Sequence, residues 1–266
     1  MNQSDKAELL RSLHRGPEIL VLPNAWDAVS ARIVETEGFP AVATTSAGCA
    51  AVFGYPDGQR IPRAEMIFLL TKIAAAVDVP VTADVEAGYD DPVQTARDVL
   101  AAGAVGFNLE DWADNELLSI DEQVRRIRAI REACGMSIVI NARTEIYLAQ
   151  HGDAATRFER SFERLNAYHE AGADCLFIPA VTDAETIGRL VKAVNGPLNI
   201  LATPGAPAIR ELKALGVARV SLGSGPSRVA LGAFRRLTRD LKTNGAFDAL
   251  RSEAIPYAEV QGLLSR

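Results

Sequence analysis

Two pairs of acidic residues follow apolar segments of this chain, and their types and spacing are suited to chemistry. The first segment reads Val81-Thr-Ala-Asp84-Val-Glu86, and the second, Val105-Gly-Phe-Asn-Leu109, is followed by Glu110-Asp111. On a strand, residues spaced i and i+2 point to the same face, so Asp84 and Glu86 are expected side by side. Carboxylate oxygens suit Mg²⁺ or Mn²⁺ better than zinc. The pattern therefore predicts a site for a hard divalent cation.

Further polar residues follow other apolar segments. Arg143 comes after Ser137-Ile-Val-Ile-Asn141, and a guanidinium that faces a pocket can bind a substrate carboxylate with two hydrogen bonds. An ion pair of Arg143 with Glu110 or Glu145 is the alternative. Ser46-Ala47-Gly48 offers a hydroxyl and unhindered backbone N–H groups for a second carboxylate, unless it is simply a loop of small residues. A cation with these donors suits a small dianion.

Missing residue types exclude two mechanisms. Of the three histidines, only His151 is predicted in a loop at the same edge as the acids, so acid–base catalysis by histidine is not expected. The lysines all lie in predicted helices or near the N-terminus. A Schiff-base mechanism needs a lysine in the pocket and is therefore not expected either.

The elements that carry these residues alternate regularly. Short apolar segments predict eight strands, at residues 19–22, 41–44, 80–84, 105–109, 137–141, 174–178, 197–201 and 218–221. Amphipathic patterns predict helices between them, at residues 26–37, 63–77, 91–102, 120–133, 155–171, 183–194, 206–214 and 226–242. Several helices end at a glycine, which readily adopts the left-handed conformation that closes a helix.

Eight strand–helix units predict an α/β fold, a TIM-type (β/α)₈ barrel, in which functional groups gather at the carboxyl ends of the strands. A doubly wound sheet is the alternative, but no Gly-x-Gly-x-x-Gly follows the first strand. No linker interrupts the pattern, so residues 1–266 are predicted to form a single domain. Residues 246–266 are expected to form a C-terminal extension, either a further helix or partner-binding arm or a mobile end.

The composition limits which binding partners and which cellular compartment are expected. The formal net charge of −6 argues against a nucleic-acid surface, and no basic run suits an anionic membrane. No apolar run reaches the roughly 18 residues that a membrane span requires. Cys49, Cys134 and Cys175 have no metal-ligand spacing and indicate thiols in a reducing compartment. A cytoplasmic protein without nucleic-acid or membrane partners is predicted.

Six blocks in order resemble the isocitrate lyase/phosphoenolpyruvate mutase superfamily over roughly residues 18–240. The blocks are Pro23-Asn-Ala-Trp-Asp-Ala28, Thr44-Thr-Ser-Ala-Gly48, Gly54-Tyr-Pro-Asp57, Asp84-Val-Glu86-Ala-Gly-Tyr89, Asn108-Leu-Glu110-Asp111 and Asn141-Ala-Arg-Thr-Glu145. The resemblance implies a (β/α)₈ barrel, Mg²⁺ and a small 2-oxo acid substrate. It also implies a homodimer or homotetramer in which subunits exchange the last barrel helix.

The resemblance also implies roles for matching residues. Asp84 would hold the metal directly, while Glu86, where these enzymes often have Asp, and Glu110 would act partly through waters. Asp57 would lie over the reacting centre, with Arg143 on a substrate oxygen and Glu110 also in the catalytic set. Residues expected to bind substrate or line the pocket are Trp26, Asp27, Ser46, Ala47, Gly48 and Asn199.

One departure from the superfamily bears on the reaction. The isocitrate and methylisocitrate lyases carry Lys-Lys/Arg-Cys-Gly-His after strand 4, whereas this loop reads Asp111-Trp-Ala-Asp-Asn-Glu-Leu-Leu118. Cleavage of isocitrate or methylisocitrate is therefore not expected. The sequence predicts a Mg²⁺-dependent lyase that acts on a 2-oxo dicarboxylate such as oxaloacetate through a metal-stabilised enolate. A phosphonopyruvate mutase or hydrolase, and a non-catalytic 2-oxo acid binding protein, are the alternatives.

Overall fold

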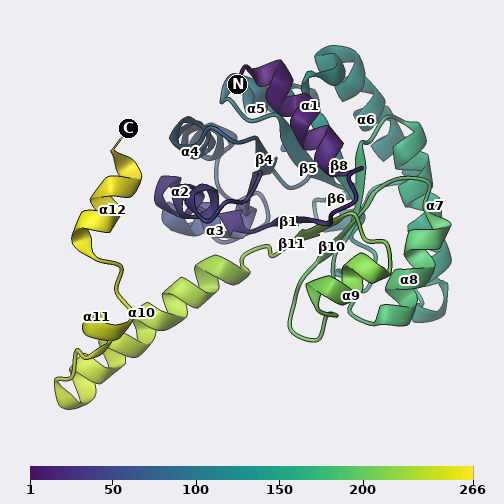
Figure 1. Cartoon of the computed structure of the whole chain (residues 1–266). Coiled ribbons are helices and arrows are strands. Elements are labelled where there is room, and N and C mark those ends of the chain that lie inside the picture. The colour runs from purple at the N-terminus through teal and green to yellow at the C-terminus, as the bar shows by residue number, and fades with distance from the viewer. Residues whose placement is uncertain (266) are drawn as a thin grey trace.

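Parallel strands form a closed barrel in the computed structural model, which describes residues 1–265 (Figure 1). Each of the eight strand positions around the barrel is called a stave here. The first stave is broken at Pro23 into β1 (Leu20–Leu22) and β2 (Asn24–Ala25). β1 pairs with the last strand, β11 (Arg219–Ser221), and β2 pairs with β3 (Val42–Thr44), so the broken stave closes the ring. The other strands are β4 (Val81–Asp84), β5 (Gly106–Glu110), β8 (Val139–Arg143), β9 (Cys175–Ile178) and β10 (Leu198–Leu201). The predicted (β/α)₈ barrel and its eight strand positions are confirmed.

Alternation along the strands separates the core from the site. In β5, Phe107 and Leu109 pack outward among the helices, whereas Asn108 points into the barrel, where its side chain meets that of Asn141 from β8. Opposite faces of a strand carry alternate residues. The outward faces thus form the main hydrophobic core, while the polar inward faces lead up to the barrel mouth.

The surrounding helices follow the predicted pattern. They are α2 (Ala28–Thr36), α4 (Arg63–Ala76), α5 (Pro92–Ala101), α6 (Ile120–Cys134), α7 (Arg157–Glu170), α8 (Ala184–Ala193), α9 (Ile209–Ala214) and α10 (Gly225–Asn244). The glycines expected to close helices do adopt positive φ angles, for example +93° at Gly103 and +113° at Gly172. Each then lets the chain turn directly into the next strand.

A helix that was not predicted, α1 (Gln3–Leu13), covers the amino-terminal end of the barrel. Leu10 is fully buried there against Leu20, Leu22 and Val139. A Cβ at Gly106 would lie 2.9 Å from Leu10 Cδ2, so this glycine lets the helix approach the barrel closely. With this end closed, the opposite mouth is left for a site.

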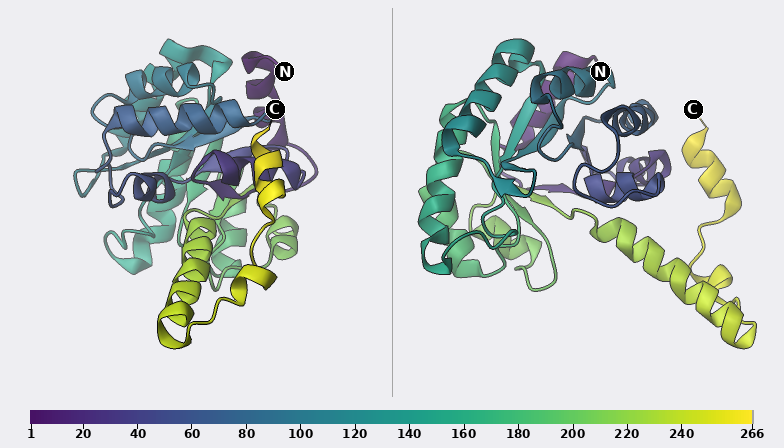
Figure 2. Two further views of the ribbon diagram at one scale, coloured as in Figure 1. Left: turned by 90° about the vertical axis from the view of Figure 1, so that its left-hand side faces the viewer. Right: turned by 180° about the vertical axis from the view of Figure 1, so that it is seen from behind.

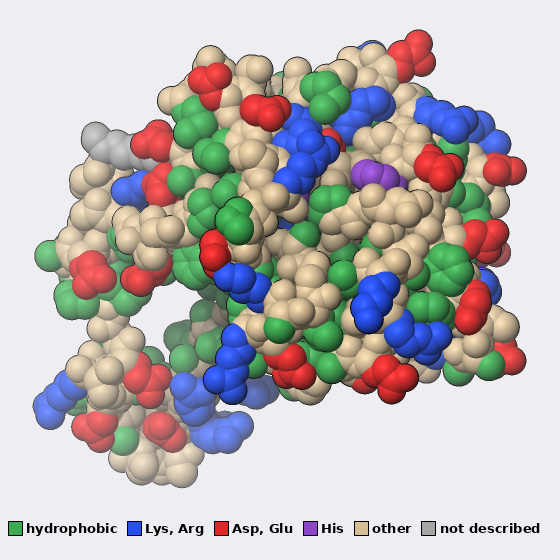
Figure 3. Space-filling model, turned by 45° about the vertical axis from the view of Figure 1, so that its right-hand side comes forward, with side chains coloured by type: hydrophobic (Ala, Val, Ile, Leu, Met, Phe, Trp, Pro, Cys, Tyr) green, Lys and Arg blue, Asp and Glu red, His purple; other side chains and the backbone are tan. Residues whose placement is uncertain are grey.

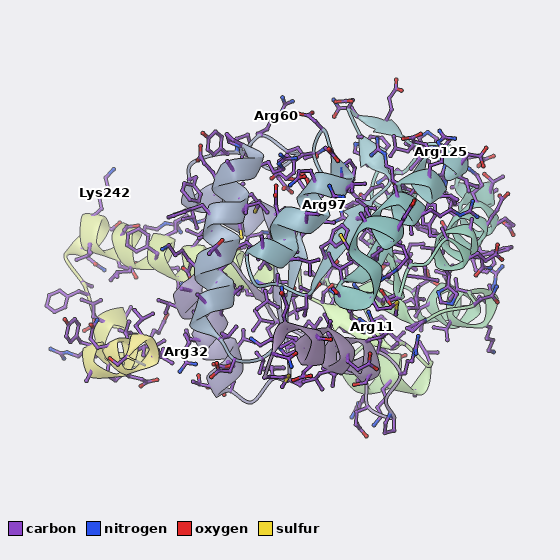
Figure 4. All side chains as sticks on the ribbon, turned by 90° about the horizontal axis from the view of Figure 1, so that it is seen from above. Arg11, Arg32, Arg60, Arg97, Arg125 and Lys242 are labelled. Carbon is purple, nitrogen blue, oxygen red and sulfur yellow. The ribbon has the colours of Figure 1, made fainter. Side chains whose placement is uncertain are left out.

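The C-terminal region leaves the barrel. Figures 1 and 2 show α10 projecting as an arm, with α11 (Ala249–Ser252) near its far end and α12 (Tyr257–Leu264) turning back toward α2. Arg32 of α2 donates to the carbonyl of Leu263 at 2.8 Å, and Figure 4 shows Arg32 beside α12 and Lys242 far along the arm. Figure 3 shows a gap between the arm and the barrel. Two helices, α11 and α12, thus lie within the segment expected to extend from the barrel. No helix within residues 1–265 is long and apolar enough to cross a membrane.

Candidate active site

Three of the predicted acids lie at the barrel mouth. Asp84 ends β4, Glu110 ends β5, and the side chains of Asp84, Glu86 and Glu110 are all buried. The Glu110 N–H donates to the carbonyl of Glu86 at 3.0 Å. Glu86 and Glu110 also line one cleft of about 1040 Å³. The structure therefore brings the acids together and aims none of them into bulk solvent.

The geometry that joins Asp84 and Glu86 differs from the expectation. β4 ends at Asp84, and Glu86 lies in a turn with φ +56°. The prediction that Asp84 and Glu86 share one face of a strand is therefore wrong. The left-handed backbone at Glu86, a costly conformation for a residue with a side chain, directs this carboxylate instead.

Asp84 is held by donors from two directions. The N–H and hydroxyl of Ser46 donate to Asp84 Oδ2 at 3.2 and 3.1 Å. The amide of Asn108 donates to Oδ1 at 3.3 Å, and Asn141 donates to Asn108 Oδ1 at 2.8 Å. Neither asparagine was given a role from the sequence, although a polar residue inside an otherwise apolar strand was a usable signal. The two amides orient Asp84 from inside the barrel.

On the other side of the mouth, Arg143 pairs with two carboxylates. Its Nη1 lies 3.2 Å from Glu110 Oε2, and its Nε pairs with Glu145. Burial alone would lower the pKa of Arg143, but the charges of Glu110 and Glu145 outweigh it and raise that pKa. The ion pairs considered as the alternative for Arg143 therefore exist. They leave part of its five N–H donors for a ligand.

Negative charge exceeds positive charge among these buried groups. Burial raises the pKa of Glu110 well above its usual value, and it raises the pKa of Glu86 to about 7. Glu86 Oε1 is buried and has no hydrogen-bond partner. Oxygen donors with uncompensated charge fit a hard divalent cation. Within residues 1–265, however, no three His, Cys, Asp or Glu side chains converge tightly enough to hold an ion by themselves.

The segment expected to cradle a carboxylate begins a helix rather than a loop. α3 (Ser46–Val52) starts directly after β3, and Thr45 caps it. A Cβ at Gly48 would lie 2.6 Å from Thr45 Cγ2 and 2.9 Å from Trp26 Cβ. Close packing against Trp26 therefore requires glycine at position 48, whether or not a ligand binds there. Ala47 and Gly48 belong to the first turn, whose N–H groups have no partner within the helix.

The remaining predicted residues lie on three other parts of the barrel. Asp57 is exposed on the loop between α3 and α4. Partial withdrawal of its carboxyl group from water, then the charge of Asp84, raises its pKa, while an interaction with Ser46 acts to lower it. Asp27 caps α2 by accepting from the Ser30 N–H at 2.7 Å. Asn199 is fully buried inside the barrel beside Ser221, at 3.4 Å.

Asp111, read from the sequence as the partner of Glu110 in an acid pair, points away from the mouth. It is fully buried, and its Oδ2 accepts from the Tyr168 hydroxyl at 2.7 Å and from Arg164 at 3.1 Å. Its Oδ1 accepts from the Glu145 N–H at 2.9 Å. The expectation that Asp111 faces the cation site is wrong, because α7 supplies its donors. Asp111 instead supports the loop that carries Glu145.

The loop without cysteine, lysine or histidine is a small hairpin. β6 (Trp112–Ala113) and β7 (Glu116–Leu117) pair antiparallel, and the two residues between them, Asp114 and Asn115, have φ angles of +52° and +63°. Both values are typical of a type I′ turn, which favours Asp and Asn. The hairpin lines the cleft with Glu110. Trp112 packs edge-on against His151, with ring centroids 6.4 Å apart.

Known proteins are similar to this chain in architecture and in sequence. Residues 10–242 match the family model of phosphoenolpyruvate phosphomutase. An uncharacterized protein of Mycobacterium tuberculosis is 35% identical over 254 residues, covering 95% of this chain and 94% of that protein. An oxaloacetate decarboxylase of Bradyrhizobium is 27% identical, over 98% of this chain and 90% of that enzyme. The structure of an oxaloacetate acetylhydrolase with its product oxalate superposes with a TM-score of 0.86 at 26% identity, over 98% of this chain and 94% of that one.

Proposed function

Because this chain belongs to the phosphoenolpyruvate phosphomutase family, whose relatives and structural neighbours include carbon–carbon lyases and mutases, we propose that it is a divalent-cation-dependent lyase. The substrate we infer is a small 2-oxo dicarboxylate of the oxaloacetate type, with Mg²⁺ or Mn²⁺ as the ion. The observation that carries the proposal is the group of buried carboxylates at the mouth, which share one guanidinium, that of Arg143.

We assign Asp84 as the direct ligand, with Glu86 and Glu110 reaching the ion through water. When bound, the cation would act as a Lewis acid on the 2-oxo and carboxylate oxygens of the substrate. The hydrogen bonds from Ser46 and Asn108 keep the Asp84 carboxylate in one orientation before any ligand arrives. The unpartnered Glu86 Oε1 would accept a hydrogen bond from such a water.

Arg143 would stabilise the charge that develops during cleavage. Its N–H groups not used by Glu110 and Glu145 would donate to the substrate oxygen that becomes negative when the bond beyond C3 breaks. Because the two carboxylates hold the guanidinium in place, little reorganisation is needed at that moment. Asp57, above Ser46, would cover the reacting centre and exclude water from it.

The first turn of α3 would bind the substrate carboxylate. Both Ser46 donors are engaged with Asp84, and the Gly48 N–H donates to the capping Thr45 hydroxyl at 3.5 Å. We therefore assign the Ala47 N–H as the donor to the ligand, with Gly48 bordering it. Trp26 and Asp27 precede α2 on the neighbouring stave and would border this end of the pocket. Asn199 would close it from inside the barrel, where its side chain is fully buried.

Two other functions have support. The family model is that of phosphoenolpyruvate phosphomutase, which favours a phosphonopyruvate mutase or hydrolase as the second candidate. A 2-oxo acid binding protein without catalysis is the third, because the hairpin at residues 112–117 carries no cysteine, lysine or histidine. The absence of isocitrate and methylisocitrate cleavage stays a prediction, made from the same loop.

A substrate panel with and without EDTA separates these functions. Oxaloacetate, phosphonopyruvate, 2-methylisocitrate and isocitrate would be incubated with Mg²⁺, and pyruvate and the other products measured. Turnover of oxaloacetate that EDTA abolishes supports the proposal. Turnover of phosphonopyruvate alone favours the second candidate, and oxalate binding without turnover of any substrate favours the third. Efficient cleavage of 2-methylisocitrate would refute our interpretation of the hairpin.

We also infer a cytoplasmic homodimer or homotetramer formed by exchange of α10. Val229 and Phe234 on this arm are 73% and 63% exposed, and an apolar cleft of about 770 Å³ lies at its base. Covering exposed apolar side chains on a projecting helix with a partner lowers the free energy of the assembly. Light scattering should give a dimer or tetramer mass, and Phe234→Glu should lower that mass to the monomer. A wild-type monomer would refute the exchange.

A further inference from the structure

Three residues with strained backbones are bonded to one another at the edge of the site. Among residues 1–265, seven non-glycine residues have positive φ angles, and three of these are Gln59 at +56°, Glu86 at +56° and Tyr89 at +59°. Left-handed backbone is unfavourable for such side chains and persists only where surrounding contacts hold it. Because these three residues come from two separate loops, their contacts show what the strain maintains.

Gln59 connects the two loops through both its backbone and its side chain. Its N–H donates to Glu86 Oε2 at 2.7 Å, and its Oε1 accepts from the Tyr89 N–H at 2.6 Å. The loop of Gln59 also carries Asp57, two residues earlier, and the turn of Glu86 and Tyr89 follows directly on Asp84. The two bonds therefore fasten the Asp57 loop to the end of β4.

The connection determines which oxygen of Glu86 is left for a ligand. With Oε2 held by Gln59, only Oε1 is unpartnered, and it is buried. A glutamate has one more rotatable bond than an aspartate, so without this contact its carboxylate has more orientations available. The Gln59 N–H removes that freedom, and both residues line the same cleft as Glu110.

We propose that Gln59 is a positioning residue, which holds Asp57 and Glu86 in a single arrangement over the cation site. This inference rests on the proposed function, since it assigns Gln59 to the same site. Gln59 does not touch the reacting atoms; it acts through the two carboxylates. Its side-chain oxygen keeps the Glu86–Tyr89 turn closed, and its left-handed backbone aims the N–H at Glu86.

Two substitutions distinguish a positioning role of Gln59 from a role in stability alone. Gln59→Met keeps the length and packing of the side chain but removes the acceptor for Tyr89. Gln59→Gly also removes it, yet relieves the cost of the positive φ angle. Gln150→Gly is the matched control, because Gln150 also has a positive φ angle, +49°, but its side chain is exposed. The control should be at least as stable as wild type and fully active.

The measurements are kcat and KM, the Kd for Mn²⁺ by titration, thermal stability, and hydrogen exchange of the Tyr89 amide. Both Gln59 variants should lose roughly 10- to 100-fold in kcat with KM changed by less than about twofold. Mn²⁺ should bind about tenfold more weakly, as when a residue supporting a metal ligand is removed. Tyr89 exchange should accelerate, although Gln59→Gly melts no lower than wild type.

The outcomes distinguish this inference from the proposed function. If wild type turns over none of the 2-oxo acids, the proposed reaction fails, but Mn²⁺ affinity and Tyr89 exchange still test the role of Gln59. Wild-type kcat and Mn²⁺ affinity in both variants would overturn the role, whatever happens to stability. Equal losses of activity in Gln150→Gly would overturn it as well, because the effect would then come from relief of backbone strain in general.

Discussion

The two ends of the barrel treat buried acids in opposite ways. At the end closed by α1, Asp174 accepts from Arg11 at 2.8 Å, from Arg131 at 2.6 Å and from the Ile140 N–H at 2.8 Å. At the mouth, several buried carboxylates share the single guanidinium of Arg143. The acidic side chains at both ends are buried, so the difference lies in charge balance and not in burial.

That difference separates stability from function. A buried carboxylate is costly unless a cation and hydrogen bonds compensate it. At the closed end two arginines compensate Asp174, so the group contributes to holding α1, α6 and the barrel together. At the mouth burial raises the pKa of Glu86 to about 7, because no ion pair to a cation offsets the loss of water around this carboxylate. Such uncompensated groups indicate where a ligand of opposite charge belongs.

The largest expected effect is on activity, from Asp84→Asn at the mouth. A cation acting as Lewis acid contributes several kcal/mol to the transition state, so loss of its ligand should cost roughly 100- to 1,000-fold in kcat/KM. Unfolding of the metal-free variant by urea should change little, because removal of a like charge offsets weaker hydrogen bonds to Ser46. A variant that keeps wild-type activity would contradict the claim that the carboxylates at the mouth serve function.

Asp174→Asn at the closed end should do the reverse. Removing one member of a buried ion-pair network destabilises a protein by about 3–5 kcal/mol, because Arg11 and Arg131 lose their charged partner. Urea unfolding measures the loss, and kcat of the folded variant should stay near that of wild type. Unchanged stability would show that the closed end does not depend on charge balance.

The pH dependence of stability sharpens the comparison further. The folded pKa of Glu86, about 7, lies above its usual value of 4.5, so the folded state binds the extra proton between these values. In EDTA, the free energy of unfolding contributed by this group should therefore fall as pH rises from 4.5 to above 7, by up to about 3 kcal/mol. Urea titrations of wild type and Glu86→Gln measure it, since the variant should lack this slope. If the free energy of unfolding changed with pH equally in the wild type and in the variant, the raised pKa of Glu86 would be contradicted.

The smallest effect is expected for Tyr168→Phe, which removes one donor from Asp111. Loss of a hydrogen bond to a buried carboxylate should cost about 1–3 kcal/mol. Because Asp111 also accepts from the Glu145 N–H, kcat should fall a few-fold as Arg143 loses its fixed partner. Tyr257→Phe, at an 80% exposed position, is the control. A stability loss with unchanged kcat would limit Asp111 to a structural role.

Much of the fold could be predicted because it depends on local pattern. The eight strands are buried apolar runs. Several helices are closed by a glycine that follows them, and neither feature depends on contacts with distant parts of the chain. α1 and α3 were not predicted. α3 is a short run of small residues whose helical state depends on the Thr45 cap and on packing against Trp26. α1 does carry a local signal in the sequence, a capping box of Asn2 and Asp5.

For the site, the sequence by itself determined which groups exist and on which strand each one lies: carboxylates at the ends of β4 and β5, one arginine at the end of β8, and no lysine or cysteine in the hairpin. Strand order places those strands side by side, so the sequence also predicts that these groups meet at the mouth. The sequence does not predict the direction of each side chain, because that direction depends on backbone angles and on partners distant in sequence. Only the tertiary structure turned Asp111 toward α7, gave Glu86 its left-handed backbone, and brought Gln59 across to hold it.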